Sequence, residues 1–193
     1  MKKLIVILFC IASSCSLFAQ DAMPLAVGAD APAFEAKDQN GKEVNLKKLR
    51  KKGSVVLIFY RGQWCPYCNK QLSALEDSLS FITAKNATVI AITPETEENV
   101  NKTIEKTKVT YSVLNDKGLK IMKAYKVAFE VDAETVKKYK GYGIDFEKAN
   151  GENGAVLPVP AVYIIDKKGK ITYAYFDKDY RKRASVKEIV ENL

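Results

Sequence analysis

Two cysteines, Cys65 and Cys68, stand two residues apart in the string Trp64-Cys-Pro-Tyr-Cys68, and this is where the chain is best equipped for chemistry. Cysteines at this spacing serve as half of a zinc site, as a structural disulfide or as a redox pair. Zinc needs four ligands, and the sequence has neither a histidine nor a second C-x-x-C pair to supply them. A structural disulfide that closes so short a loop stabilises the folded protein only slightly. The spacing therefore favours a pair that cycles between dithiol and disulfide.

The 193-residue chain contains no histidine. This composition excludes Ser-His and Cys-His nucleophile pairs, histidine-ligated zinc and histidine proton shuttles. Any reaction must run on cysteine, carboxylate, lysine or tyrosine side chains, or on a cofactor. The pattern around the cysteines implies no organic cofactor and no metal.

The local sequence places the cysteine pair where a strand gives way to a helix. The apolar run 55–60 predicts a strand buried on both faces, and apolar residues at helical spacing follow over 72–82. Pro66 is disfavoured inside a helix but favoured in its first turn, so the helix begins at about Cys65. Both sulfurs then lie within one helical turn, close enough to form a disulfide.

The start of this helix also predicts which thiol reacts. Its free N–H groups and macrodipole stabilise a thiolate, and they lower the pKa of a cysteine below its usual value of about 8.5. Arg61 is the only charged residue between Ser54 and Trp64, and its positive charge acts in the same direction. The strand supplies no carboxylate, so an acid serving as proton relay must come from elsewhere. We expect Cys65, at the helix start, to be the more exposed and attacking thiol, and Cys68 to resolve the adduct.

Hydrophobic periodicity and turn signals predict one α/β domain, a sheet flanked by helices, without internal repeats. Asn40-Gly41 predicts the turn of a small N-terminal β-hairpin, and Ser185 with Glu188 predicts a capped final helix. The first expected elements are this hairpin, a strand over 55–60, a helix over 65–82, a strand over 88–92 and a helix from Pro94. There follow a short strand, a helix over 116–125, an irregular insertion over 126–157 with one helix at 133–139, strands over 161–165 and 171–175, and a helix over 185–193.

The first 19 residues form a predicted secretory signal. Lys2 and Lys3 precede a nine-residue apolar run, and serines follow it before Ala19. Nine residues are too few to span a bilayer, which needs about 20. We expect cleavage after Ala19, export to the periplasm and a single mature domain over 20–193. The alternative is a lipoprotein signal with a lipid anchor at Cys15.

Removing this signal changes the charge and the cysteine count. The basic residues fall from 31 to 29 against 23 acidic residues, so the net charge falls from +8 to +6, and only Cys65 and Cys68 remain of four cysteines. The basic excess is spread along the chain, apart from a run over 47–52 that is typical of a solvated turn. Nucleic-acid binding needs a basic face with stacking aromatics, and an exported protein seldom meets nucleic acid. These features argue against a nucleic-acid partner.

A strand, the string Trp-Cys-Pro-Tyr-Cys, a helix and a late proline in Val159-Pro160-Ala161 resemble the thioredoxin superfamily. The strings APAFEAKDQNGKEVNL, VVLIFYRGQWCPYC, LPVPAVYIIDKKGKI and FDKDYRKRAS are similar to the peroxiredoxin-like branch of the alkyl hydroperoxide reductase / thiol-specific antioxidant (AhpC/TSA) family. The resemblance covers nearly all of residues 27–193. It implies a thioredoxin-like fold for the mature domain: a mixed central sheet flanked by helices, with an N-terminal hairpin and an insertion before the cis-proline strand.

The resemblance also implies roles for residues around the cysteines. The late proline of the superfamily is cis and packs against the cysteine pair, and here it is Pro160 after Val159. Trp64 packs beside the pair in thioredoxins as a docking surface; packing into the core is the alternative. Arg181 or Arg183 corresponds to the anion-stabilising arginine of peroxiredoxins, and a solvated basic run is the alternative.

The two related families assign opposite roles to the cysteines. In the peroxiredoxin motif Pro-x-x-x-Thr-x-x-Cys, Cys68 falls on the attacking position, Cys65 replaces the threonine that orients the peroxide, and Arg61 replaces the proline. In thioredoxins, Cys65 attacks and Cys68 resolves. Losing one oriented donor costs on the order of 100-fold in rate, so the sequence ranks disulfides above hydrogen peroxide as substrates.

Together these features predict an exported thiol-disulfide oxidoreductase or peroxiredoxin-like antioxidant protein that reduces disulfides or hydroperoxides through Cys65 and Cys68. Its expected partners are a thiol/disulfide redox protein, a small-molecule disulfide or a hydroperoxide. The membrane is involved only through the signal or the lipid anchor. The alternative is a non-enzymatic thioredoxin-fold binding module, in which the disulfide is inert and the insertion over 126–157 makes the contacts.

Overall fold

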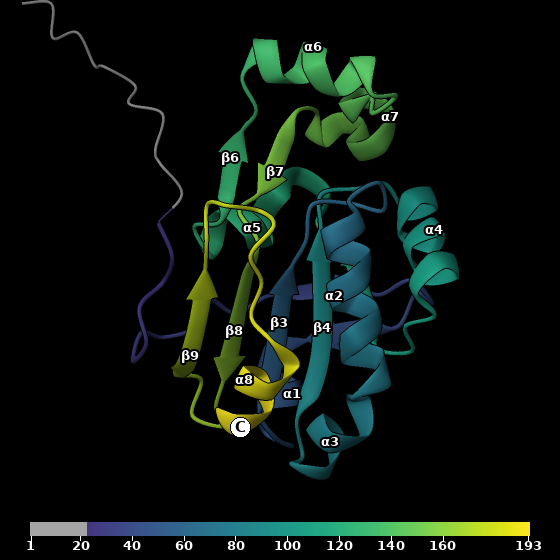
Figure 1. Cartoon of the computed structure of the whole chain (residues 1–193). Helices are drawn as coiled ribbons and strands as arrows, with labels where there is room; N and C mark the ends of the chain where they lie inside the picture. Colours follow the sequence, from purple (N-terminus) through teal and green to yellow (C-terminus); the bar gives the residue numbers. More distant parts are fainter. Residues whose placement is uncertain (1–22) are drawn as a thin grey trace, which may run out of the picture.

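The computed structural model describes residues 23–193, so the predicted signal over residues 1–19 and the alternative lipid anchor at Cys15 lie outside it. Its centre is a five-stranded mixed sheet flanked by helices, as the sequence predicts (Figure 1). In spatial order the strands are β5 (Ser112–Asn115), β4 (Thr88–Thr93), β3 (Val55–Phe59), β8 (Ala161–Ile165) and β9 (Ile171–Phe176). Within residues 23–193, no helix has both the length and the apolar character needed to cross a bilayer.

The central strand β3 determines where the cysteine loop lies. All five of its residues are buried, because helices cover both faces of the sheet. β4 runs parallel to β3, and β5 runs parallel to β4, whereas β8 and β9 are antiparallel to their neighbours. The carboxyl ends of β3 and β4 therefore meet at one edge of the sheet, and the segments that follow them lie side by side.

Successive residues of β3 point into two separate cores, as the alternation of a strand requires. Val56 and Ile58 belong to one core, and Val55, Leu57 and Phe59 belong to the other. The first core is covered by α2 (Pro66–Asp77), α3 (Leu79–Ala84), α4 (Glu97–Thr107) and α8 (Val186–Glu191). The second is covered by α1 (Leu46–Arg50), the 3₁₀ turn η1 (Lys117–Leu119) and α5 (Lys120–Ala124).

Two short ribbons complete the fold. β1 (Glu35–Lys37) and β2 (Glu43–Asn45) form the predicted N-terminal hairpin, whose turn includes Gly41 at a φ of 74°. β6 (Ala128–Glu130) and β7 (Val156–Pro158) pair antiparallel at the two ends of the insertion. Between them lie α6 (Ala133–Gly141), α7 (Phe146–Asn150) and the 3₁₀ turn η2 (Gly151–Asn153). The insertion stands over the edge of the sheet at which β3 and β4 end (Figure 1).

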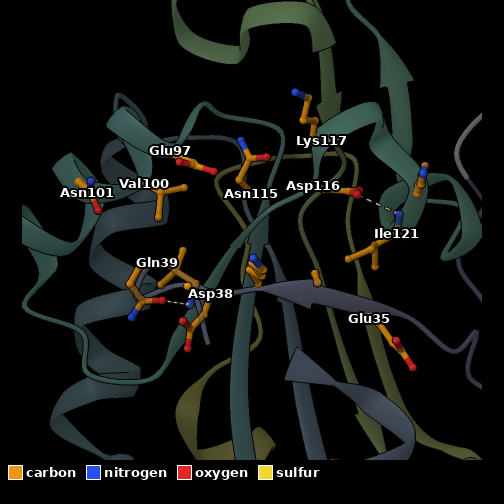
Figure 2. Close-up of a pocket in the computed structure, with 15 residues that line it drawn as sticks. Glu35, Asp38, Gln39, Glu97, Val100, Asn101, Asn115, Asp116, Lys117 and Ile121 are labelled. Atoms are coloured by element: carbon orange, nitrogen blue, oxygen red, sulfur yellow. Dashed lines mark hydrogen bonds between the residues drawn. The ribbon is translucent and has the colours of Figure 1, made fainter. Parts of the chain in front are cut away.

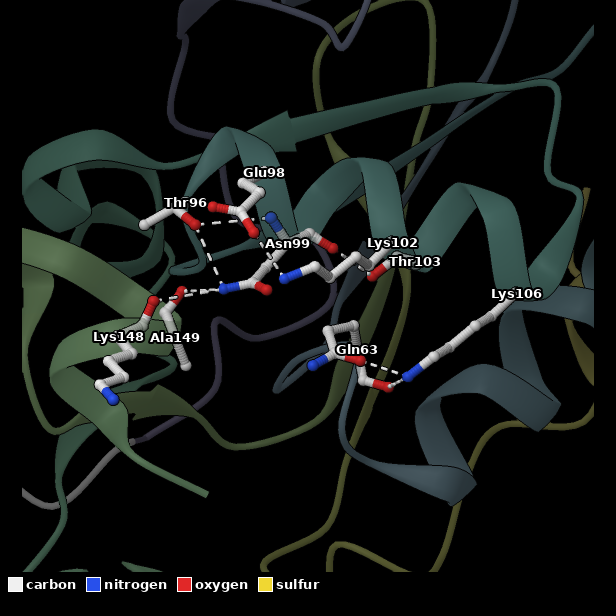
Figure 3. Close-up of polar contacts among 9 residues, drawn as sticks. All are labelled: Gln63, Thr96, Glu98, Asn99, Lys102, Thr103, Lys106, Lys148 and Ala149. Atoms are coloured by element: carbon white, nitrogen blue, oxygen red, sulfur yellow. Dashed lines mark hydrogen bonds and ion pairs between the residues drawn. The ribbon is translucent and has the colours of Figure 1, made fainter. Parts of the chain in front are cut away.

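Helix α4 ties the insertion to the sheet. The side-chain amide of the buried Asn99 donates to the carbonyl oxygens of Ala149 (3.0 Å) and Lys148 (3.3 Å) in α7 (Figure 3). From the other end of the same helix, Lys106 donates to the backbone carbonyl of Gln63 in the cysteine loop (3.3 Å). One helix therefore holds both the insertion and the cysteine loop in place.

The helices differ from the sequence-based expectations at several places. The predicted helix over 116–125 is divided into η1 and α5 at Leu119, and α1 lies where a basic turn was expected. The predicted helix over 65–82 is broken at Ser78 into α2 and α3. The next helix begins after Thr96 rather than at Pro94, because the Thr96 hydroxyl accepts a hydrogen bond from the Asn99 amide (3.4 Å) and caps the helix. Within the insertion, the predicted helix is present, but α7 and the β6–β7 pair were not expected. That pair joins residues far apart in sequence, which local patterns do not reveal.

The expectation that Val159–Pro160 is a cis peptide is wrong: every peptide bond within the described residues is trans. The reason lies in the β6–β7 ribbon. Pro158 pairs with Ala128, and the amide of Val159 donates to the carbonyl of Val127 (2.8 Å). The chain therefore leaves the ribbon extended and runs directly into β8.

Candidate active site

The cysteine pair lies at the start of α2, as the sequence predicts. Cys65 is the N-cap residue of the helix, Pro66 is its first residue, and Cys68 lies in its first turn. The amide of Cys65 donates to the carbonyl of Gly62 (3.0 Å), which closes the turn between β3 and the helix. Both thiols are free. The two sulfurs lie within one helical turn and are close enough to shift each other's pKa.

Cys65 is the more exposed of the two thiols, as expected, but only by a small margin, and neither thiol is open to solvent. Cys65 is 1% exposed and Cys68 is fully buried. The segment that leads into α8 closes over the helix start: Ala184 belongs to the same buried cluster as both cysteines, and Arg183 contacts Cys68. This covering segment is remote in sequence from the C-x-x-C pair.

The charge around the pair favours a thiolate on Cys68. Nη2 of Arg183 lies 3.5 Å from the Cys68 sulfur. Burial raises the pKa of Cys68, but the hydrogen bond from Cys65 and the charge of Arg183 outweigh it and lower the pKa to about 6. In contrast, the hydrogen bond to Cys68 and burial raise the pKa of the Cys65 thiol. This distribution is the reverse of the one expected from the helix start alone.

Of the two candidate arginines, the structure brings only Arg183 to the cysteines. Arg181 is exposed and forms a two-pronged ion pair with Asp179, with distances of 2.8 Å and 3.0 Å. Arg183 is held by the backbone carbonyls of Tyr180 and Lys182. Its Nε is buried and has no hydrogen-bond partner within the described part of the chain. A donor therefore remains available on the arginine that contacts Cys68.

Glu95 is a buried acid at the site that the sequence analysis did not identify. It lies two residues after the end of β4 and is fully buried, and its Oε2 accepts a hydrogen bond from the Gln63 backbone amide (2.7 Å). A Cβ on Gly62 would lie 2.6 Å from both Oε1 of Glu95 and Nε1 of Trp64, so only glycine allows this close approach. A carboxylate after a buried parallel strand, at the sheet edge shared with the C-x-x-C loop, was the available signal.

Burial also determines the charge of Glu95. Burial raises its pKa, the hydrogen bond from Gln63 lowers it, and the nearby negative charge of Cys68 raises it further, to about 8. At neutral pH the carboxyl group is therefore largely protonated. A neutral Glu95 avoids placing a second negative charge beside the Cys68 thiolate.

Arg61 is buried beneath the insertion, and Trp64 is half-buried there. The Arg61 guanidinium lies 4.9 Å from the Trp64 ring, 5.4 Å from Tyr139 and 4.2 Å from Tyr180, and it donates to the Tyr139 hydroxyl. The Trp64 ring meets Tyr139 and Phe146 edge to face, at centroid distances of 5.5 Å and 5.9 Å. The insertion therefore covers the face on which a docking surface was expected.

Pro160 and Arg61 both line a cavity of about 350 Å³. A second cavity, of about 400 Å³, lies between the N-terminal hairpin, β5 and α4 (Figure 2). Its polar groups hold the backbone: Gln39 accepts the Val113 amide (2.8 Å), and Asp116 accepts the amides of Ile121 (3.0 Å) and Met122 (2.7 Å). None of the residues expected to do chemistry lines this second cavity.

The sequence of this chain is similar to those of proteins with thiol chemistry. A model of the AhpC/TSA family matches residues 27–174. The chain belongs to the AhpC/TSA family. Among its AhpC/TSA relatives, chloroplastic peroxiredoxin Q of Triticum aestivum is 30% identical over 148 residues, which cover 77% of this chain and 58% of the relative. The thiol-disulfide oxidoreductase ResA of Bacillus cereus is 27% identical over 155 residues, covering 80% of this chain and 72% of the relative.

Solved structures show the same AhpC/TSA fold. Peroxidoxin BcpB from Mycobacterium tuberculosis superposes with a TM-score of 0.66 at 19% identity, covering 86% of this chain and 94% of the other. A peroxiredoxin-like protein from Aquifex aeolicus gives a TM-score of 0.67 at 18% identity, covering 89% and 87%. The chain spans only 58% of the length of the wheat peroxiredoxin Q.

Within residues 23–193 no group of three or more Cys, Asp or Glu side chains is placed to hold a metal.

Replacing Glu95 by Gln should change how stability depends on pH. Because the pKa of Glu95 is raised from 4.5 to about 8, the folded protein holds a proton that the unfolded chain has lost between these values. The free energy of unfolding contributed by this group therefore falls as the pH rises. We expect Glu95→Gln to gain stability over wild type between about pH 5 and about pH 8, on the order of 3 kcal/mol.

Urea denaturation at several pH values measures this difference. The matched control is Glu97→Gln, which changes an exposed glutamate two residues away. This substitution removes an exposed rather than a buried carboxyl group, so it should not reproduce the gain in stability of Glu95→Gln. A Glu95→Gln variant whose stability follows that of wild type across this range would contradict the buried, protonated carboxyl group.

Proposed function

We propose that this protein is a thiol-dependent peroxidase in which Cys68 attacks the hydroperoxide and Cys65 resolves the product. The observation that carries the proposal is the contact of the Arg183 guanidinium with the fully buried Cys68, at 3.5 Å. With a pKa lowered to about 6, this sulfur is mostly thiolate at neutral pH. The relatives named peroxiredoxin and thiol-disulfide oxidoreductase support thiol chemistry in general.

The proposed cycle involves two sulfur atoms and one external reductant. The Cys68 thiolate attacks the terminal oxygen of a hydroperoxide R–O–OH, so that an S–O bond forms, the O–O bond breaks, and RO⁻ leaves and takes up a proton. Cys68 is then a sulfenic acid. The Cys65 sulfur attacks it, the S–S bond forms, and the thiol proton leaves with the hydroxyl group as water. An external dithiol returns two electrons and restores both thiols.

In the peroxiredoxin motif a threonine orients the peroxide, and this chain lacks that threonine. We propose that Arg183 takes over part of its role. Its charge stabilises the thiolate, and its buried Nε has no partner within the described residues, so it can donate to a peroxide oxygen. Cys65 stands at the threonine position and is a poor donor. We therefore assign the orientation of the O–O bond to Arg183.

Reduction of disulfides is the second candidate function, favoured by the C-x-x-C pair and by the ResA relatives. The sequence alone ranks disulfides first, because Cys65 replaces a hydroxyl donor. Burial of both sulfurs reverses this ranking in our proposal. Both sulfurs are 0% or 1% exposed, so a protein disulfide, like the external dithiol that closes the cycle, reaches them only if the segment before α8 moves, whereas hydrogen peroxide needs a much smaller opening.

We also propose export, with residues 1–19 as the signal. The support is the basic start followed by a short apolar run. N-terminal sequencing of the protein from the periplasmic fraction should give Gln20 as the first residue. A mature chain that begins with a lipid-modified Cys15 would replace this proposal by a lipid anchor, and a full-length chain in the cytoplasm would contradict it.

The cysteine roles can be tested by pre-steady-state kinetics. With hydrogen peroxide at neutral pH, Cys68→Ser should abolish the fast step. Cys65→Ser should keep it and stop at a sulfenic acid on Cys68, visible by mass spectrometry as one added oxygen. Wild type should react faster with hydrogen peroxide than with an equal concentration of a small disulfide. Loss of the fast step in Cys65→Ser alone would reverse the roles, and faster reaction with the disulfide would favour the second function.

The role of Arg183 can be tested separately, with Arg181 as a matched control. Arg183→Met removes the counter-charge, so the pH midpoint for alkylation of Cys68 should rise from about 6 toward about 8.5. The rate constant with hydrogen peroxide should fall roughly 100-fold. Arg181→Met should leave the pH midpoint nearly unchanged and should change the rate constant by less than about twofold, because Arg181 is exposed and pairs with Asp179. Equal effects of the two substitutions would contradict the assignment.

A further inference from the structure

Residues 177–184 run from the end of β9 across to α8 and lie over the cysteine pair, and we call this segment the flap (Figure 1). Its Arg183 lies 3.5 Å from the Cys68 sulfur, and its Ala184 packs in the same buried cluster as both cysteines. Hydrogen peroxide needs only a small opening to reach Cys68. The external dithiol, in contrast, must bring its own sulfur against a sulfur of the disulfide. The cycle therefore requires the flap to move at one stage.

The flap is held together by contacts within itself. The Arg181 guanidinium pairs with Asp179 (2.8 Å), and the Lys182 ammonium pairs with Asp177 (3.6 Å). The Lys182 amide also donates to the Asp179 carbonyl (2.9 Å) and closes a turn. Each of these contacts joins two residues of the flap, so movement of the flap away from the cysteines breaks none of them. The flap can therefore move as one compact piece of chain.

Two contacts between the flap and the cysteine segment involve a charge. The Tyr180 ring lies 4.2 Å from the Arg61 guanidinium and 5.9 Å from the ring of Tyr67, which stands between the two cysteines. The second contact is that of Arg183 with Cys68. The charge of Arg61 stays the same throughout the proposed cycle. The charge of Cys68 does not, so the reaction itself alters the second contact.

Oxidation removes the anion that faces Arg183. In the disulfide neither sulfur carries a charge, and the guanidinium then lies against a neutral group. Its buried Nε already has no hydrogen-bond partner among residues 23–193. The carboxylates of the flap are engaged elsewhere, because Asp179 pairs with Arg181 and Asp177 pairs with Lys182. A cation held out of water without a counter-charge is costly, so oxidation favours a position of Arg183 in solvent.

From these contacts we infer that the flap is a redox-controlled gate: the Cys68 thiolate holds it closed through Arg183, and the disulfide releases it. This inference rests on the proposed function and adds a control of access to the same site. The closed flap limits the thiolate to small oxidants, and the open flap admits the external dithiol. The gate thereby keeps the oxidant step and the reductant step apart.

The reductant step then follows in the open form. One thiolate of the dithiol attacks the Cys65 sulfur and forms a mixed disulfide, and Cys68 leaves as a thiolate because its pKa is the lower of the two. The second thiol of the dithiol attacks the mixed disulfide and releases Cys65. Two electrons pass from the dithiol to the protein. Of its two protons, one goes to Cys65 and one to water, and the restored thiolate closes the flap.

Helix α2 stays packed while the flap moves. Cys65 is its N-cap residue and Cys68 lies in its first turn, so the disulfide spans a single helical turn. Leu72 and Leu75 hold the rest of α2 in the buried core. The opening is therefore confined to the flap and the cysteine loop beneath it.

Hydrogen exchange read by mass spectrometry tests the gate without peroxide. Diamide gives the disulfide form and dithiothreitol the dithiol form. We expect the amides of residues 177–184 and 61–68 to exchange about tenfold faster or more in the disulfide form, while those of 70–77 stay within about twofold. Equal exchange in the two forms would overturn the inference. Faster exchange over 70–77 would place the opening in the helix and would overturn it as well.

Two substitutions of Cys68 separate the effect of charge from that of the disulfide, which neither variant can form. Cys68→Ser carries no charge and should exchange like the disulfide form, whereas Cys68→Asp keeps a negative charge beside Arg183 and should exchange like the dithiol form. Arg183→Met should exchange fast in both redox forms, and the matched control Arg181→Met should keep the difference between them. Equally slow exchange in Cys68→Ser and Cys68→Asp would overturn the inference.

A bulky disulfide tests whether the flap closes the dithiol form. Tyr180→Ala removes the ring on Arg61 but keeps the backbone carbonyl that accepts a hydrogen bond from Arg183. It should raise the rate constant with the aromatic disulfide DTNB about tenfold or more and leave the reaction with hydrogen peroxide within about threefold. Tyr142→Ala, which removes a 70% exposed ring from the insertion, should change neither rate. Equal DTNB rates in wild type and Tyr180→Ala would contradict closure by the flap.

These measurements separate the gate from the proposed function. If hydrogen peroxide reacts rapidly at Cys68 but hydrogen exchange is the same in both redox forms, the gate fails and the peroxidase function stands. If hydrogen exchange follows the redox form but hydrogen peroxide does not react, the peroxidase function fails and the gate stands.

Discussion

A negatively charged sulfur held out of water is the constraint on which the rest of this site depends. Cys68 is fully buried, and a buried anion is stable only where charges and donors replace its hydration. The Cys65 thiol, at the N-cap of α2, supplies the hydrogen-bond donor. Arg183, in the segment before α8, supplies the positive charge. The backbone positions both residues. Cys65 is the N-cap of α2, and Arg183 donates hydrogen bonds to the carbonyl oxygens of Tyr180 and Lys182.

The parallel pairing of β3 and β4 explains why an acid lies beside this anion without opposing it. Parallel strands end at the same edge of a sheet, so the loop after β3 and the residues after β4 must share space there. Glu95 fills this space, and the absence of a side chain at Gly62 lets it approach. Burial keeps its carboxyl group protonated at neutral pH, which makes it compatible with the Cys68 thiolate.

The insertion covers part of the end of the sheet at which the cysteine loop lies. It brings Tyr139 and Phe146 over the cysteine loop, where they pack on Trp64, and Tyr139 also accepts a hydrogen bond from Arg61. Its ends pair as β6 and β7 and form an apolar wall, while Asn99 in α4 anchors its second helix. The same insertion also lines the apolar cavity next to Arg61, which forms no ion pair with a carboxylate of residues 23–193.

The sequence by itself determined the features that depend on neighbours within a few positions. These include the strand and helix around the C-x-x-C pair, the hairpin at Gly41 and the capping box at Ser185. The resemblance to AhpC/TSA proteins added the family and the fold, but it also predicted a cis bond before Pro160 that the β6–β7 ribbon replaces by an extended trans path. Only the tertiary structure decided which sulfur carries the charge. Arg183 is 115 residues from Cys68 in sequence, and burial and charge pairing depend on contacts between such distant segments, which no local pattern records.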